Sequence, residues 1–245
     1  MPLYGLIGYP LGHSFSAAWF AEMFCREGIT DAAYRNFPLA SIEELPGLWA
    51  AHPDLEGLNV TAPYKVAVMR YLAHVDPVAQ AIGAVNCIVR RPEGWCGYNV
   101  DWIGFGETLR LLLAGERPRG LVLGTGGASQ AACYALERLG IRYLSVSRTP
   151  KNGRQIAYAD LSPEVMAAHR LIVNATPLGT FPAVDAAPPI PYDQLTPHHI
   201  LYDMVYNPPL TAFLRHGQEH GCRISNGRGM LERQAEESWR LFSGR

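Results

Sequence analysis

The residues that could do chemistry are most concentrated in the stretch GLNVTAPYK, residues 57–65. Asn59, Thr61 and Lys65 place an amide, a hydroxyl and an amine close together there. The apolar residues around Asn59 predict a short buried strand, and Pro63 stops extended pairing and suits the first turn of a helix. Strand-to-helix corners in α/β proteins face the crevice where ligands bind. A single lysine is usually a surface charge, but three different polar groups at one corner favour a functional site.

Other polar residues near this stretch have both a structural and a functional interpretation. Ser14 and Ser16 precede a predicted helix, where either could be its N-cap, yet together they would present two hydroxyls to one crevice. Asn86 lies in an otherwise apolar strand, so it is either a structural bridge or a ligand contact. Asp101 begins a predicted helix. An N-cap and a carboxylate that orients the Lys65 ammonium explain Asp101 about equally well on local grounds.

A glycine-rich turn, GTGGAS at residues 124–129, follows a predicted strand and precedes a predicted helix. Glycines let the backbone approach a pyrophosphate closely, and the helix start offers free N–H groups. The pattern G-x-G-G-x-S departs from G-x-G-x-x-G, and a tight turn without a ligand is the alternative. The context of strand, loop and helix nevertheless predicts a mononucleotide-binding unit.

The end of the next predicted strand decides between NAD and NADP. An acidic residue there would hold the ribose hydroxyls of NAD, but this chain has Ser147, Arg148 and Thr149. A guanidinium followed by a hydroxyl suits a 2′-phosphate, so the sequence favours NADP. An ordinary solvated basic loop is the alternative, and it is more serious for Lys151 and Arg154 than for Arg148.

Composition excludes several classes of protein. The chain has 245 residues and a formal net charge of −1, which gives no electrostatic reason to expect nucleic acid or an anionic membrane as partner. No apolar run is long enough to span a bilayer. Five scattered cysteines without a C-x-x-C pair predict neither a metal site nor a redox motif, and they suit free thiols in a reducing compartment. We therefore expect a cytoplasmic protein without a metal.

Strand and helix signals alternate along the chain, which predicts an α/β fold with mostly parallel strands. We expect two α/β domains joined near Asp101, with a capping box from Ser41 to Glu44. The predicted strands are residues 3–8, 33–37, the stretch ending before Pro63, 84–91, 95–98, 121–124, 143–147, 171–174, 200–204 and 223–225. The predicted helices are residues 16–27, one opened by Ser41, 64–72, 101–113, 128–139, 162–169 and 230–242.

Taken together and in order, the polar motifs resemble the shikimate dehydrogenase family from the first strand to the last helix. No single motif is specific, but their conjunction is. The motifs are SFS at 14–16, NVTAPYK at 59–65, GAVN at 83–86, NVD at 99–101 with Gly104 and Phe105, GTGGA at 124–128, NATP at 174–177, YDMVY at 202–206, and Gly227 with Met230, Leu231 and Gln234.

The resemblance implies reversible reduction of 3-dehydroshikimate to shikimate by NADPH, in the chorismate pathway to aromatic amino acids. It implies a mostly parallel α/β substrate-binding domain (1–100), a Rossmann-like NADP-binding domain (101–225) and a cleft between them. The C-terminal segment (226–245) is expected to pack back onto the first domain. Lys65 and Asp101 would be the catalytic pair. Implied substrate contacts are Ser14, Ser16, Thr61, Asn86, Tyr206 and Gln234. Implied cofactor contacts are Gly124, Thr125, Gly126, Gly127, Ala128, Ser147, Arg148, Thr149, Thr176, Met204 and Gly227. Asn59 is expected to support the corner rather than touch the substrate.

The chain departs from the family pattern after the second cofactor-domain strand. Ser147 replaces an asparagine, and Asn152 falls where a second basic residue is usual, with Lys151 or Arg154 as substitutes. The segment 149–170 is short, and residues 152–153 predict a turn where a long crossover helix is expected. This favours either a homodimeric partner chain or a smaller cofactor domain.

Two other functions compete with this hypothesis. One is a quinate/shikimate dehydrogenase that prefers NAD, which the serine pair and the lack of an acidic residue after Val146 disfavour. The other is a non-catalytic regulatory module that binds NADP. The presence of both Lys65 and Asp101 disfavours the module, because binding alone does not need that pair.

Overall fold

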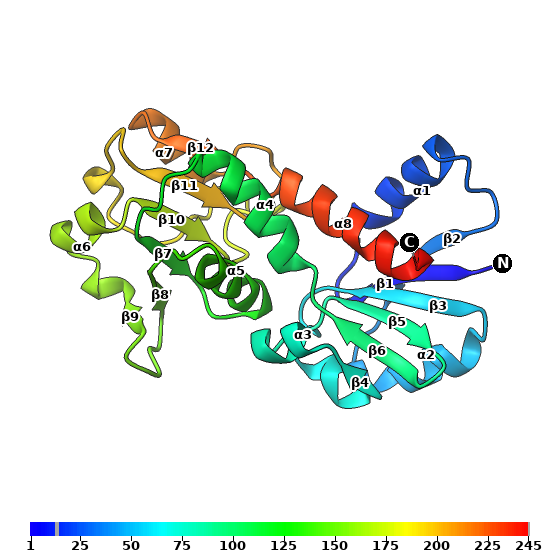
Figure 1. The fold of residues 1–245 in the computed structure, drawn as a ribbon. Helices are drawn as coiled ribbons and strands as arrows, with labels where there is room; N and C mark the ends of the chain where they lie inside the picture. Colours follow the sequence, from blue (N-terminus) through cyan, green and yellow to red (C-terminus); the bar gives the residue numbers. More distant parts are fainter. Residues whose placement is uncertain (13–14, 245) are drawn as a thin grey trace. The chain divides into compact units, whose positions relative to one another are not determined.

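The computed structural model describes residues 1–12 and 15–244. Its chain divides into two compact units, each with its own sheet (Figure 1). The first unit consists of Met1–Val100 and Gln234–Arg245, and the second of Asp101–Arg233. The helix α8 (Arg228–Ser243) therefore contributes residues to both units. The α/β fold class expected from the sequence is confirmed.

The first unit contains a six-stranded sheet in the order β2-β1-β3-β5-β6-β4. Strand β1, second in this order, is buried along its whole length and pairs in parallel with β2 and β3. Strand β5 runs antiparallel to both β3 and β6, and β4 pairs in parallel with β6. The strands are β1 (Leu3–Gly8), β2 (Ala33–Pro38), β3 (Leu55–Val60), β4 (His74–Val75), β5 (Cys87–Arg91) and β6 (Gly94–Tyr98). The helices are α1 (Ser16–Arg26), α2 (Leu45–Ala51) and α3 (Pro77–Ile82), with 3-10 helices at Ile42–Glu44 (η1) and Ala67–Tyr71 (η2).

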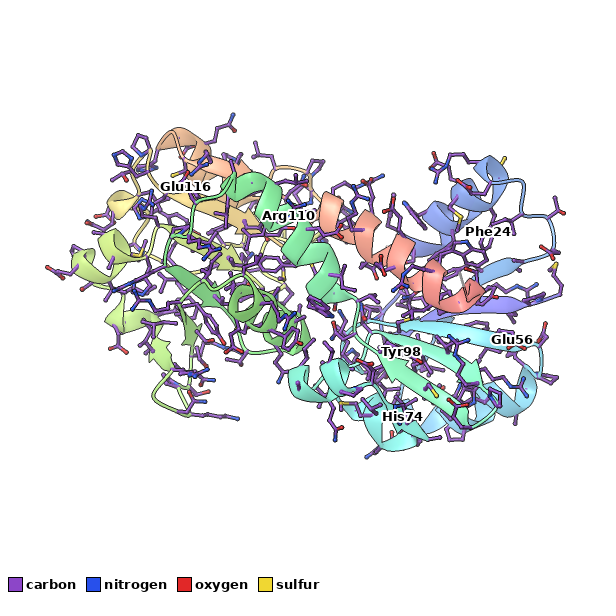
Figure 2. All side chains as sticks on the ribbon, in the orientation of Figure 1. Phe24, Glu56, His74, Tyr98, Arg110 and Glu116 are labelled. Carbon is purple, nitrogen blue, oxygen red and sulfur yellow. The ribbon has the colours of Figure 1, made fainter. Side chains whose placement is uncertain are left out.

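Both faces of this sheet are covered. Alternate residues of β1 point to opposite faces, so Leu3 and Ile7 join one apolar cluster while Tyr4 joins another. The second cluster packs α1 and α8 against the sheet. In it, Tyr4 stacks on Phe242 with ring centroids 4.9 Å apart. Figure 2 labels Phe24 of α1, another member of this second cluster.

The expected helix over residues 64–72 is wrong. After Val60 the chain forms a turn, and only the short η2 follows. The carbonyl of Thr61 accepts from the Tyr64 amide at 3.0 Å, while the carbonyl of Lys65 accepts from the distant Val85 amide at 2.8 Å. Tyr64 still accepts from the Val68 amide at 2.9 Å, but an α-helix would need the Lys65 carbonyl for the amide four residues on, and that carbonyl is already used.

The sequence predicted one other local feature of this unit and missed another. The Ser41–Glu44 capping box is confirmed, although it opens η1, from which α2 continues. Helix α3 was not predicted from the sequence. Its signal is Asp76 before Pro77, because the Asp76 carboxylate accepts from the Val78 amide at 2.9 Å as an N-cap.

The second unit contains a six-stranded sheet in the order β12-β11-β10-β7-β8-β9 with all neighbours parallel. Counted from β7, this is the strand order 3-2-1-4-5-6 of the doubly wound dinucleotide-binding fold. Its topological switch point lies between β7 and β10. The strands are β7 (Gly120–Leu123), β8 (Tyr143–Ser147), β9 (Gln155–Ala157), β10 (Leu171–Asn174), β11 (Ile200–Asp203) and β12 (Arg223–Ser225). The helices are α4 (Asp101–Leu113), α5 (Gly127–Arg138), α6 (Pro163–Ala168), α7 (Ala212–Glu219) and the start of α8.

The segment between β8 and α6 differs from the sequence expectation in one element. The turn at residues 152–153 is confirmed, because the Gln155 amide donates to the Asn152 carbonyl at 3.0 Å. That turn leads into strand β9, which the sequence did not predict and which pairs with β8. Three residues are too short a run to show a strand period. Helix α6 matches the expected helix, with Ser162 as its N-cap.

Buried hydrogen bonds hold the C-terminal part of α8 against the first sheet. Asn59 in β3 accepts from the Tyr34 hydroxyl at 2.8 Å and donates through Nδ2 to Ser238 Oγ at 2.6 Å. The Ser238 hydroxyl donates in turn to the Gln234 carbonyl at 2.8 Å. A Cβ added to Gly57 would overlap the ring of Phe242, so α8 approaches β3 closely at this glycine. Asn59 is thus a buried residue that holds α8 against β3.

Ser238→Ala should lower the free energy of unfolding by about 1–3 kcal/mol, because it removes the better of the Nδ2 acceptors of buried Asn59. Ser243→Ala is the matched control, since Ser243 makes the same bond to the carbonyl four residues earlier, at 2.8 Å from Trp239 O. That control should change the unfolding free energy by less than about 0.5 kcal/mol. Urea unfolding followed by fluorescence measures both. Equal losses in the two variants would contradict the role given to Ser238.

Candidate active site

The corner after β3 is held by backbone hydrogen bonds to its neighbours. The Thr61 amide donates to the Ile7 carbonyl at 2.9 Å, which ties the corner to the end of β1. A Cβ on Gly8 would overlap Thr61 Cγ2, so the threonine packs directly on that glycine. The Val85 amide donates to the Lys65 carbonyl at 2.8 Å. The backbone that carries Thr61 and Lys65 is therefore fixed at both ends.

Asn86 joins three segments of the first unit. Its carbonyl accepts from the Val60 amide at 2.9 Å, and its amide donates to the Tyr98 carbonyl at 3.0 Å. Its side-chain Oδ1 accepts from the Val100 amide at 2.7 Å. Asn86 is 2% exposed, and these bonds make it a structural bridge, while the ligand contact stays a prediction. The bridge fixes the residue that immediately precedes Asp101, which is itself buried and begins α4.

Three of the other expected substrate contacts are described. Ser16 is the first residue of α1, whose N-cap is Phe15, so the N-cap interpretation of Ser16 is wrong. Its side chain hydrogen-bonds to the phenol of Tyr34. Gln234 lies on α8 within the first unit, and Tyr206 follows β11 in the second. Ser14 lies outside the described residues.

The glycine loop has the geometry of a phosphate-binding turn. Gly124 has a φ of 107°, a left-handed value that favours glycine, and a Cβ there would lie 3.2 Å from Thr176 Cγ2. The Ser129 hydroxyl donates to the Gly124 carbonyl at 2.7 Å and closes the turn. Gly126 is the N-cap of α5 and supplies no side-chain cap. The first amides of α5, from Gly127 on, have no carbonyl partner within the helix and suit an anion.

The loops after β10 and β11 each lie close to a glycine. Thr176 donates through Oγ1 to Asn174 Oδ1 at 2.6 Å, which holds it beside Gly124. A Cβ on Gly227 would overlap the carbonyl of Met204, so only glycine fits there. Thr125 and Ala128 lie on the glycine loop and at the start of α5 respectively.

The basic loop after β8 contains one arginine with a carboxylate partner and one near a phenol. Arg154 lies 3.1 Å from Glu137, so it is already paired. The charge of Arg148 interacts instead with Tyr158, whose pKa is raised by burial and lowered by that arginine. Ser147 is buried, and its Oγ accepts from the Thr149 amide at 3.2 Å. Of the substitutes expected from the sequence, Arg154 is thus the one already committed to a partner.

Several supporting residues were missed by sequence reasoning. Tyr34 and Ser238 contact Asn59 from segments far away in the chain, and no local pattern indicates them. Asn174 and Asp203 end two buried strands and are fully buried. The rule applied to Asn86, that a polar residue in an apolar strand needs a partner, could have found both.

Three other kinds of feature bear on the function: metal-ligand clusters, membrane-spanning helices and paired cysteines. Among residues 1–12 and 15–244, no cluster of histidines, cysteines and carboxylates could hold a metal ion. Within the same residues, no helix has the length and apolarity to cross a membrane. All five cysteines are free thiols, and Cys87 and Cys96 occupy non-opposed positions of the β5–β6 hairpin.

Comparisons with known proteins agree with this geometry. A family model described as the shikimate dehydrogenase substrate binding domain matches residues 6–88. A curated shikimate dehydrogenase (NADP(+)) from Moorella thermoacetica is 36% identical, with 99% of this chain and 88% of that protein covered. The shikimate 5-dehydrogenase of Thermus thermophilus, solved with NADP(H) and shikimate, is 32% identical with a TM-score of 0.86, and 100% of this chain and 94% of that one are covered.

The solved quinate dehydrogenase of Corynebacterium glutamicum, in complex with NAD, is also similar. It is 29% identical with a TM-score of 0.87, and 100% of this chain and 94% of that one are covered. Over nearly its full length, however, the chain exceeds 30% identity with curated shikimate dehydrogenases. The chain belongs to the shikimate dehydrogenase family.

Proposed function

We propose that this protein catalyses the reversible NADPH-dependent reduction of 3-dehydroshikimate to shikimate, in chorismate and aromatic amino-acid biosynthesis. The observation that carries the proposal is the corner with Thr61 and Lys65, held by Ile7 and Val85 in a chain of this family. The first unit would bind the substrate and the second the cofactor. The names of the curated relatives support NADP as that cofactor.

The second unit fits a dinucleotide on its own geometry. The left-handed Gly124, the Gly227 that admits no Cβ and the first amides of α5 form a backbone surface suited to a pyrophosphate. The residues that would hold the cofactor are Gly124, Thr125, Gly126, Gly127, Ala128, Ser147, Arg148, Thr149, Thr176, Met204 and Gly227. NADPH supplies the hydride when it is bound.

Lys65 is proposed as the acid of the reaction. Negative charge develops on a ketone oxygen as hydride arrives, and an ammonium can both stabilise that charge and donate a proton to it. Of the 21 lysines and arginines, only Lys65 and Lys151 are lysines. Arginine does not release its proton near neutral pH, so a lysine at this corner suits proton transfer as well as charge.

Asp101 is proposed as the carboxylate that orients the Lys65 ammonium. The contacts that support this run through the backbone: Val85 bonds to the Lys65 carbonyl, and Asn86 holds Val100, the neighbour of Asp101. Ser14, Ser16, Thr61, Asn86, Tyr206 and Gln234 are proposed to contact the carboxylate and hydroxyls of the substrate. Hydroxyls and amides in fixed positions suit such a polyol.

The proposal also includes a cellular location and an oligomeric state. Five free thiols favour a cytoplasmic location, where thiols stay reduced. The direct turn from β8 to β9, with no helix between Arg148 and Arg154, supports a homodimer that covers one face of this sheet, with a smaller cofactor domain as the alternative.

Lys65→Ala should lower kcat for shikimate oxidation by about 10²–10⁴-fold, the range for loss of a general acid or base. Lys65→Arg keeps the charge without a transferable proton, so it should recover only part of the lost rate. Initial rates with NADP measure both, with NADP+ binding as the control for an intact cofactor site. A variant Lys65→Ala with wild-type kcat would refute the mechanism.

Arg148→Ala should raise KM for NADP by about tenfold, because a charge-assisted bond to the 2′-phosphate is lost, while KM for NAD stays unchanged. Arg154→Ala is the matched control in the same loop, since Arg154 already pairs with Glu137. We expect less than a twofold change from it. An equal rise for both cofactors in Arg148→Ala would argue against 2′-phosphate recognition by this residue.

A further inference from the structure

Asp203 is a buried carboxylate within the YDMVY motif at 202–206, and the proposed chemistry gives it no role. It ends β11 with no exposed surface. Burial raises its pKa to about 6, so at neutral pH it is ionised in an environment that disfavours the charge. An uncompensated buried charge is costly, and its retention calls for a specific set of donors.

Three donors from three different segments converge on this carboxylate. Asn174 at the end of β10 donates through Nδ2 to Oδ1 at 2.9 Å. The Val205 amide, in the loop after β11, donates to the same oxygen at 3.0 Å. The hydroxyl of Thr211, the N-cap of α7, donates to Oδ2 at 2.6 Å. The Asp203 carboxylate therefore connects the ends of β10 and β11 with the start of α7.

The first of these connections leads to the glycine loop. Asn174 Oδ1 accepts from both the amide and the hydroxyl of Thr176, at 3.0 and 2.6 Å. Asn174 Nδ2 also donates to the Leu178 carbonyl at 3.3 Å. Asn174 has used its oxygen on Thr176, so only its amide nitrogen faces Asp203. This orientation places the methyl group of Thr176 against Gly124.

The second connection leads to the other glycine. The bond from the Val205 amide to Asp203 turns the chain sharply after β11, and the residue inside that turn is Met204. The carbonyl of Met204 then lies where a side chain on Gly227 would be, and the Gly227 amide donates to the Val205 carbonyl at 3.0 Å. Asp203 is thus hydrogen-bonded to one of the loops that the cofactor is expected to contact, and through Asn174 to the other.

We propose that Asp203 is a positioning residue for cofactor binding, which holds the Thr176 loop and the Met204 loop in register through its bonds to Asn174, Val205 and Thr211. The inference rests on the proposed function, since it takes these loops to line the NADP site. Asp203 itself lies behind the loops and acts through them.

Thr211 gives the cleanest test because it can be changed without touching the loops. Thr211→Val removes the hydroxyl that donates to Asp203, at nearly constant shape, and should weaken NADP+ binding about tenfold, the equivalent of one charge-assisted bond. Thr211→Ser keeps the hydroxyl and should restore the wild-type Kd within about twofold. Isothermal titration with NADP+ at 25 °C measures these constants on folded protein.

The matched control is Ser162→Ala. Ser162 is also a hydroxyl N-cap in the second unit, on α6, and has no bond to Asp203. Thr211→Val and Ser162→Ala both lose an N-cap and should both lower the melting temperature, but only Thr211→Val should change the Kd for NADP+. Wild-type Kd in Thr211→Val, or an equal change in both variants, would overturn the inference. No NADP+ binding by the wild-type protein would instead overturn the proposed function.

Asp203→Asn adds a pH profile as a second readout. The titratable groups that interact with the carboxylate are the phenols of Tyr192 and Tyr202, and the tilted ring of His216 contacts that of Tyr192. Burial raises the pKa of both phenols, that of Tyr202 to about 12, so neither ionises in the acidic range. Protonation of Asp203 as pH falls through about 6 removes the charge that holds the donors.

Above pH 6 the wild-type Kd for NADP+ should therefore be lower than that of Asp203→Asn, and the two constants should converge below pH 6, where the wild-type carboxyl is also uncharged. The ratio of the two constants cancels the titration of the 2′-phosphate, which occurs near the same pH. We expect the Kd of Asp203→Asn divided by that of the wild type to be about ten at pH 8 and to fall towards one at pH 5. A ratio that is independent of pH would overturn the role of the Asp203 charge.

Discussion

Asn86 is the residue on which the arrangement of the first unit depends. Its backbone and side chain together form hydrogen bonds to the end of β3, the end of β6 and the residue before α4. These points lead from regular structure to Thr61, a candidate substrate contact, and to the candidate catalytic pair Lys65 and Asp101. A buried amide left without partners would cost about 1–3 kcal/mol, so the three segments and Asn86 stabilise one another. The position of the corner is thus a consequence of buried polar groups that must be paired.

In the second unit, the buried group that must be paired is charged: it is the carboxylate of Asp203. Parallel strands bring their carboxyl ends to one edge of the sheet, which is where dinucleotides bind in doubly wound folds. At that edge, buried polar groups at the strand ends hydrogen-bond to the loops that follow. Asn174 and Asp203 hold the loops, and glycines at positions 124 and 227 let those loops approach the neighbouring backbone. Rigid elements beneath the loops make a site that needs little reorganisation on binding.

Much of the fold could be predicted from the sequence, because it depends on local signals. Strand β8, strand β10 and helix α4 have the expected bounds, and the glycine loop lies between the expected strand and helix. The failed helix after residue 64 shows the limit. Its propensity is local, but the bond from Val85 to the Lys65 carbonyl comes from twenty residues away. The contact between Asn59 and Ser238 spans 179 positions and leaves no periodic trace in either segment. The candidate site residues were predicted through a family resemblance, whereas the groups that support them become visible only in the folded chain.

The central claim is that this protein is an NADP-dependent shikimate dehydrogenase, and initial rates of the wild-type protein test it most directly. Shikimate and quinate are each assayed as reductants with NADP and with NAD, which gives four values of kcat/KM. The account predicts that the pair of shikimate and NADP has the highest value. A higher value with NAD, or with quinate, would contradict it, and cofactor binding without turnover of either substrate would favour a regulatory module.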